Sequence, residues 1–101
     1  MKFICSLVVV DDIPRARDFY ERILGQTVLT DFGENVAFEG GFAIHQKEHY
    51  RKLIMNNPVQ HGSNSFELYF EHDQVDEVVI RLKNENIEFI HEIVEQPWKQ
   101  R

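Results

Sequence analysis

The alternation of apolar and polar positions produces the same pattern twice along the chain. In the first copy, the apolar residues 7–10 end at an acidic pair, and a segment with apolar residues at helical spacing follows at once. In the second, residues 66–70 lead through a short acidic stretch into another such segment. The acidic residues before the two segments, Asp12 and Asp73, lie 61 positions apart (73 − 12). The pattern predicts a duplicated strand-plus-helix unit, and the groove between two such units would be the place for a functional site.

The first copy predicts the order β-α-β-β-β. Residues 3–10 are apolar on both faces, which predicts an inner strand covered on each side. Asp12 is a suitable helix cap, Pro14 fits the first turn, and Gly25 is a suitable terminator. Three short strands are then predicted, followed by one helical turn, over residues 27–31, 35–39, 41–46 and 48–55.

The second copy predicts only β-α-β. A strand is expected over residues 65–71, a helix capped by Asp73 follows, and a last strand covers residues 87–94. A turn-rich stretch separates the copies. We therefore expect one domain with a first module at residues 1–56, a linker at 57–63 and a partial second module at 64–101.

Composition narrows the classes of protein. With 101 residues and 43% hydrophobic positions, the chain can bury a core without stabilising disulfides or metal ions. A single cysteine, Cys5, excludes an internal disulfide. The net charge is −6, and Arg15, Arg17 and Arg22 alternate with acidic residues, which disfavours nucleic-acid binding. No stretch reaches the roughly 20 apolar residues of a membrane span, and the first residues do not form a signal peptide. A cytoplasmic protein is expected.

Two motifs in the first copy resemble the vicinal oxygen chelate superfamily, which includes glyoxalase I, bleomycin-resistance proteins and extradiol dioxygenases. They are Leu7-x-Val9-x-Asp11-Asp12 and Asp18-Phe19-Tyr20-x-x-Ile23-Leu24-Gly25; Phe66-Glu67-Leu68-Tyr69-Phe70 resembles the start of its second module. The resemblance implies an α+β fold of paired βαβββ modules, here with a second module lacking its last two strands. It does not define a reaction, because this fold supports isomerases, dioxygenases and non-catalytic binders.

The resemblance also implies a cleft with up to four metal ligands, taken from the first and last strands of each module. The matching positions here are Cys5, His45 (or Gln46 if the register shifts by one) and Glu67. The fourth ligand, a glutamate on a final strand, has no counterpart. Further cleft residues are expected at Tyr69, Glu71 and His91.

Each of these side chains also has a plainer interpretation. Cys5 can be a small buried apolar residue, while His45 and Glu67 can lie on solvated strand edges or faces. The other histidines, His49 and His72 among them, are expected to be exposed.

Two functions remain open. The first is a metal-dependent lyase or isomerase of the glyoxalase type, with one divalent ion (Zn, Ni, Fe or Mn) and Glu67 as ligand or catalytic base. The alternative is a metal-free small-molecule-binding or drug-sequestering protein of the bleomycin-resistance type, for which a net charge of −6 suits a cationic ligand. A ferredoxin-like regulatory domain is disfavoured, because three or four strand signals separate the two helices. Since the second copy stops early, either the chain is truncated or a homodimer completes the sheet.

Overall fold

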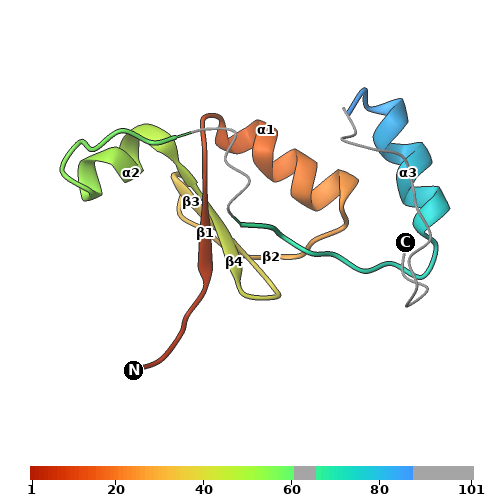
Figure 1. The fold of residues 1–101 in the computed structure, drawn as a ribbon, viewed down its shortest axis with the longest axis horizontal. Helices are drawn as coiled ribbons and strands as arrows, with labels where there is room; N and C mark the ends of the chain where they lie inside the picture. The colour runs from red at the N-terminus through yellow and green to blue at the C-terminus, as the bar shows by residue number, and fades with distance from the viewer. Residues whose placement is uncertain (61–65, 88–101) are drawn as a thin grey trace. The chain divides into compact units, whose positions relative to one another are not determined.

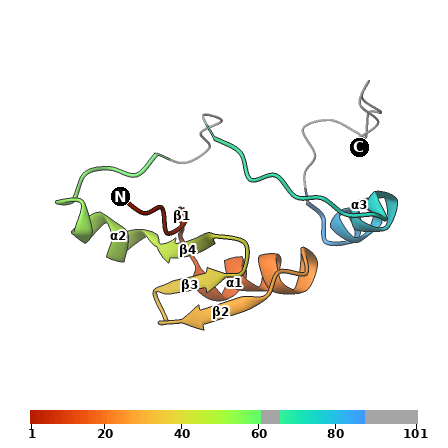
Figure 2. The same cartoon turned by 90° about the horizontal axis from the view of Figure 1, so that it is seen from below.

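The computed structural model of the chain describes residues 1–60 and 66–87 (Figures 1 and 2). The chain divides into two compact units, Met1–Phe66 and Glu67–Arg101. No helix in the described ranges is long and apolar enough to cross a membrane.

The first unit contains the predicted βαβββ module. Its elements are β1 (Ser6–Val10), α1 (Ile13–Asp18), the π-helical turn η1 (Phe19–Ile23), β2 (Val28–Asp31), β3 (Asn35–Phe38), β4 (Phe42–Gln46) and α2 (Lys47–Leu53). The strands form one sheet in the order β1-β4-β3-β2. Because β1 is parallel to β4, the chain must cross over between them, and it does so through α1 and the β2–β3 hairpin.

The first strand differs from its prediction in length and in position. It begins at Ser6, and the preceding Phe3 and Ile4 are 77% and 73% exposed. Among the described residues β1 pairs with β4 alone, so it is an edge strand of this sheet rather than an inner one. The pattern indicates that both faces are apolar, but it carries no information on how many neighbours the strand has.

The connection from β1 into the helix forms as its residues predict. Asp12 has an extended backbone, and its Oδ1 accepts a hydrogen bond from the Arg15 N–H at 3.1 Å. The helical segment ends before Gly25, whose φ of +68° is a left-handed conformation that glycine adopts without steric cost.

The core of the unit lies between the sheet and the helical segment α1–η1. Val36, Phe38 and Ile44 are at most 1% exposed. The ring of Tyr20 contacts Phe38 and Phe42, with centroids 5.7 and 5.4 Å apart, and the two phenylalanines stack at 4.9 Å. Burial of the Tyr20 hydroxyl raises its pKa. This apolar face fixes the strand register, since a shift by one residue would turn the aromatic rings to the opposite face.

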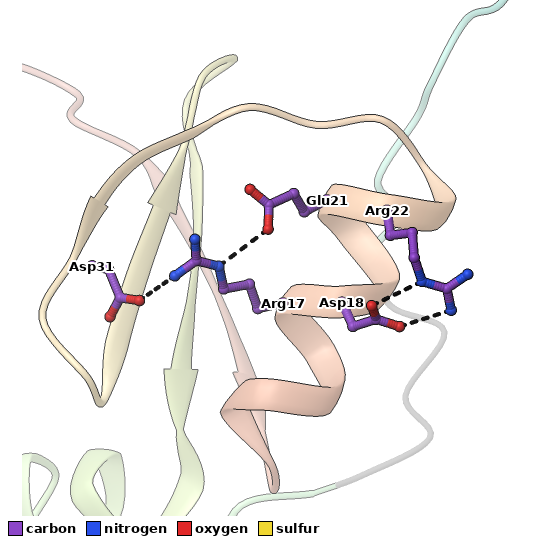
Figure 3. Close-up of polar contacts among 5 residues, drawn as sticks. All are labelled: Arg17, Asp18, Glu21, Arg22 and Asp31. Atoms are coloured by element: carbon purple, nitrogen blue, oxygen red, sulfur yellow. Dashed lines mark hydrogen bonds and ion pairs between the residues drawn. The ribbon is translucent and has the colours of Figure 1, made fainter.

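Ion pairs on the outer surface of the helical segment add a second link to the sheet. Arg17 binds Glu21 on the next turn and Asp31 at the end of β2, and Arg22 binds Asp18 (Figure 3). The hydrogen bond that Arg22 donates lowers the pKa of the Asp18 carboxyl, and the hydrogen bond that Arg17 donates to Glu21 raises the pKa of Arg17. Exposed pairs of this kind add little to stability, so the apolar core carries the fold.

In the second unit the predicted helix forms, whereas its predicted cap and the predicted strand before it do not. Its helix α3 spans Val75–Asn84, and its N-cap is Gln74 without a side-chain cap bond, so the prediction of Asp73 as the cap is wrong. The described residues of the predicted strand, 66–71, form no strand. A strand forms only where a neighbouring strand pairs its backbone groups, so apolar alternation by itself does not produce one. Residues 88–94 of the last predicted strand lie outside the described ranges.

Candidate functional site

The polar centre of the first unit is His45, on the face of the sheet opposite the helix α1. Its neighbour Phe42 packs against Tyr20 on the α1 side, and alternation along β4 then directs Ala43 and His45 to the other face. His45 is only 6% exposed and is the one buried polar residue in the described part of the chain. The predicted orientation of His45, away from the helix, therefore agrees with the strand geometry.

Both ring nitrogens of His45 contact protein groups. Nδ1 lies 2.9 Å from the side-chain nitrogen of Asn35 on β3, and Nε2 lies 2.7 Å from Nδ1 of His49 on α2. His49 in turn places its Nε2 2.9 Å from the carboxylate of Glu34. The two imidazoles stack at 4.9 Å, and the ring of Tyr50 meets His45 edge-on. These side chains form one continuous chain, Asn35–His45–His49–Glu34, which we call the histidine relay.

The relay has one consistent set of donors when both rings are neutral. The Glu34 carboxylate only accepts, so Nε2 of His49 carries a proton and its Nδ1 accepts. Nε2 of His45 then donates to His49, and Nδ1 of His45 accepts from the amide of Asn35. Burial and the neighbouring His49 lower the pKa of His45, and Glu34 opposes this shift only in part. His45 is therefore neutral near pH 7, and no lone pair on its ring is left free.

His49 is the residue that sequence reasoning missed. Its polar neighbours in the sequence favour an exposed side chain, yet it lies in the first turn of α2 with its Nδ1 2.7 Å from Nε2 of His45. The carboxamide of Gln46 caps this helix by accepting from the His49 N–H at 2.9 Å. The spacing His45-x-x-x-His49 across a strand-to-helix junction was the available signal.

The remaining predicted site residues lie elsewhere. Cys5 is half-buried and immediately precedes β1. The register sets Val9 beside His45, so Cys5 is four residues further along the sheet, or about 13 Å at ~3.3 Å per residue. Glu67, Tyr69 and Glu71 belong to the second unit and are exposed, and His91 lies outside the described residues.

These positions bear on the metal centre that the resemblance implies. A zinc ion holds its nitrogen and sulfur ligands at about 2.0–2.3 Å, so ligands of one ion lie within about 4.5 Å of each other. Cys5 and His45 do not meet that condition. Residues 1–60 and 66–87 hold no group of three or more His, Cys, Asp or Glu side chains placed to bind a metal ion. The described residues of the first unit by themselves do not fit the implied ion.

The βαβββ module, with its polar residues on the face opposite the helix, defines the class of the protein. Residues 3–101 match the family of glyoxalase-like domains. The chain belongs to this family, within the superfamily of glyoxalases, bleomycin-resistance proteins and dioxygenases. No curated protein matches the chain significantly.

Solved structures support the same assignment. A protein of unknown function from Agrobacterium tumefaciens str. C58 is 38% identical, with a TM-score of 0.87 over 100% of this chain and 81% of that one. A glyoxalase/bleomycin resistance protein/dioxygenase from Nocardioides is 20% identical, with a TM-score of 0.62 over 97% of this chain and 70% of the other. A lactoylglutathione lyase from Agrobacterium tumefaciens is 23% identical, with a TM-score of 0.61 over 97% and 79%. The last two share the fold, and the reaction of this chain does not follow from them.

Proposed function

We propose that this chain is a small-molecule-binding protein of the glyoxalase-like family that holds its ligand without a metal ion. The observation that carries the proposal is the histidine relay. The buried imidazole at the expected ligand position, His45, uses both nitrogens in contacts with Asn35 and His49. Binding a metal there would break one of these contacts, and a hydrogen bond of this kind contributes about 0.5–1.5 kcal/mol to stability.

A cationic organic molecule is the ligand class that the charge favours. The chain carries a net charge of −6. Two carboxylates of the first unit are largely open to solvent: the side chain of Asp11, which follows β1, is 71% exposed, and that of Glu34, at the end of the relay, is 60% exposed. Tyr69 and Glu71 of the second unit are also exposed, and an aromatic ring and a carboxylate are both groups that attract a cation. An acidic surface attracts cations and raises the rate at which they associate.

We further propose that two copies of the chain complete the binding site. In the described sheet, β1 is an edge strand without a charged residue or proline to protect it, and Leu7 on it is 45% exposed. A homodimer that covers this edge would bury it. Sedimentation equilibrium at micromolar concentration should give twice the chain mass, whereas a monomer that binds its ligand fully would contradict this part of the proposal.

The competing function is a metal-dependent lyase or isomerase with Cys5, His45 and Glu67 as ligands. A thiolate, an imidazole and a carboxylate are donors that suit Zn, Ni, Fe or Mn, and a bound divalent ion would supply Lewis-acid stabilisation of an anionic intermediate. In this alternative, Glu67 would also hold or move the substrate proton. It requires the second unit or a second copy to bring Glu67 to the sheet.

A thermal-shift screen of chelator-treated protein distinguishes the two functions. The probes are cationic glycopeptides and, separately, Zn²⁺, Ni²⁺, Fe²⁺ and Mn²⁺. An organic ligand at 100 times its Kd stabilises the fold by about 2.7 kcal/mol, and for a domain of this size that raises Tm by about 11–22 °C. We expect that shift with an organic cation in the presence of chelator. Stabilisation by a metal alone, at about one ion per chain and lost in Glu67→Gln but kept in Glu77→Gln, would replace this proposal with the enzyme.

A further inference from the structure

The helix α2 covers His45, and its own attachment to the sheet is slight. His45 is 6% exposed because His49 and Tyr50 of α2 lie over its ring. The helix contacts β4 and β1 and follows β4 without a loop. Any molecule that reaches His45 from this face must therefore displace α2.

The packing of α2 indicates that it opens more easily than the sheet. It has only two turns, and none of its residues is fully buried. Its last residue, Leu53, is 62% exposed, and the following Met55 is 86% exposed. Met55 and Asn56 both have φ near +60°, a conformation that costs free energy in a residue other than glycine. The far end of the helix thus gains little from packing.

Polar contacts of the first turn hold α2 in place. His49 bonds to His45 at 2.7 Å and to Glu34 at 2.9 Å. The remaining links to the sheet are weaker, because Lys47 lies 3.8 Å from Asp11 and the carboxamide of Gln46 donates to the Asp11 carbonyl at 3.3 Å. Tyr50 meets the ring of His45 edge-on, and His49 is the residue of α2 whose side chain hydrogen-bonds to that ring.

We propose that α2 is a hinged cover over His45, latched by His49, and that opening it exposes the imidazole on the binding face of the sheet. The opening is a local event that leaves the β3–β4 pairing and the aromatic core intact, as expected for the least stable part of a fold. Only the nature of the molecule that enters rests on the proposed function. The cover itself is tested without any ligand.

Chemical labelling of histidines with diethyl pyrocarbonate measures how accessible the ring of His45 is beneath α2. The reagent acylates neutral imidazoles, and burial already keeps the pKa of His45 low, so slow labelling at pH 7 reports access rather than charge. His72, with a side chain 46% exposed, is an internal reference in the same chain. Trypsin separates His45 from His49, because Lys47 lies between them. Molecules modified once are scored, so that labelling of His49 does not itself open the cover.

The expected result is labelling of His45 at least ten times slower than that of His72. In His49→Ala, the difference should fall to about threefold or less, while Lys52→Ala, a change at an exposed position of the same helix, should leave it unchanged. Circular dichroism and Tm show whether each variant is folded. Equal labelling of His45 and His72 in the unaltered chain would overturn the proposal, as would protection of His45 that survives in folded His49→Ala.

Hydrogen exchange provides a second test that needs no folded His49→Ala. In the unaltered chain, the amides of α2 should exchange at least ten times faster than those of β3 and β4. His49→Gln should accelerate exchange in α2 alone. Equal exchange rates in the helix and the strands would show that α2 opens only by global unfolding, and the cover would then be excluded.

Discussion

The two units of this protein begin with the same pattern and form different structures. In the first, residues 7–10 lie in a strand, Asp12 caps a helix, and an aromatic core closes against the sheet. In the second, residues 66–71 form no strand, Asp73 caps nothing, and α3 has no fully buried residue. The helices form in both cases, because a helix satisfies its own backbone. The strand of the first unit, in contrast, depends on β4, which pairs with it along its whole length.

The difference shows where the stability of the chain resides. In the first unit, long-range contacts join segments that are far apart in the sequence, whereas the described part of the second unit contains a local helix. Changes to matched positions in the two units should therefore have unequal effects.

The largest expected difference is in the core. Phe38 is 1% exposed, and Phe38→Ala should lower the free energy of unfolding by about 3–5 kcal/mol through lost burial and a cavity. The half-buried Val78 on α3 is the counterpart, and Val78→Ala should cost about 1 kcal/mol or less. Urea unfolding followed by circular dichroism measures both. Equal losses would mean that α3 packs as tightly as the sheet.

The helix caps should differ by less. Asp12→Ala removes a hydrogen bond to the Arg15 N–H and should cost about 1 kcal/mol. Asp73 makes no cap bond, so Asp73→Ala should change stability by about 0.5 kcal/mol or less. The same urea experiment compares them, and a larger loss in Asp73→Ala would reinstate it as the cap.

Much of the first unit follows from its residues, and the limits have physical causes. The signals that begin and end the first helical segment act locally, so its position is predictable. They are Asp12 and Pro14 at its start and Gly25 after its end. Whether β1 lies at the edge or in the interior of the sheet depends on strands elsewhere in the chain, so its own residues do not predict it. The relay was only half predictable: strand alternation orients His45, but its contact with His49 depends on how α2 turns back over β4. A contact that depends on the direction of the chain between two elements, such as that of His45 with His49, leaves no periodic pattern in the sequence.

Acid should destabilise the first unit through the relay. The folded state lowers the pKa of His45 below its ordinary value of about 6.5. The unfolded chain therefore takes up a proton that the folded chain resists. The stability that the neutral ring confers is fully present above the unfolded-state pKa of about 6.5. It is lost as the pH falls through the lower pKa of the folded state. Unfolding free energies from pH 7.5 to 5.0 should decline, with the same slope in His72→Gln and a smaller one in His45→Gln. A flat profile would contradict the buried neutral ring.

The smallest effect concerns the ion pairs of Figure 3. Arg17→Met should reduce Tm slightly in dilute buffer by removing the links to Glu21 and Asp31. The difference should vanish near 1 M NaCl, where screening acts within about 3 Å. Lys52→Met, a change at an exposed position of α2, is the control. A loss in Arg17→Met that persists in salt would show that its aliphatic stem, rather than its charge, holds α1 to β2.

The state of the His45 ring is the measurement that tests the metal-free account most directly. Long-range ¹⁵N–¹H NMR spectra at pH 7 should show both His45 and His49 protonated at Nε2, as the donor order of the relay requires. One equivalent of Zn²⁺ should leave the ring-nitrogen shifts of His45 unchanged. A stoichiometric change of the Nδ1 or Nε2 shift of His45 on adding Zn²⁺ would place the ion on that ring and contradict the account.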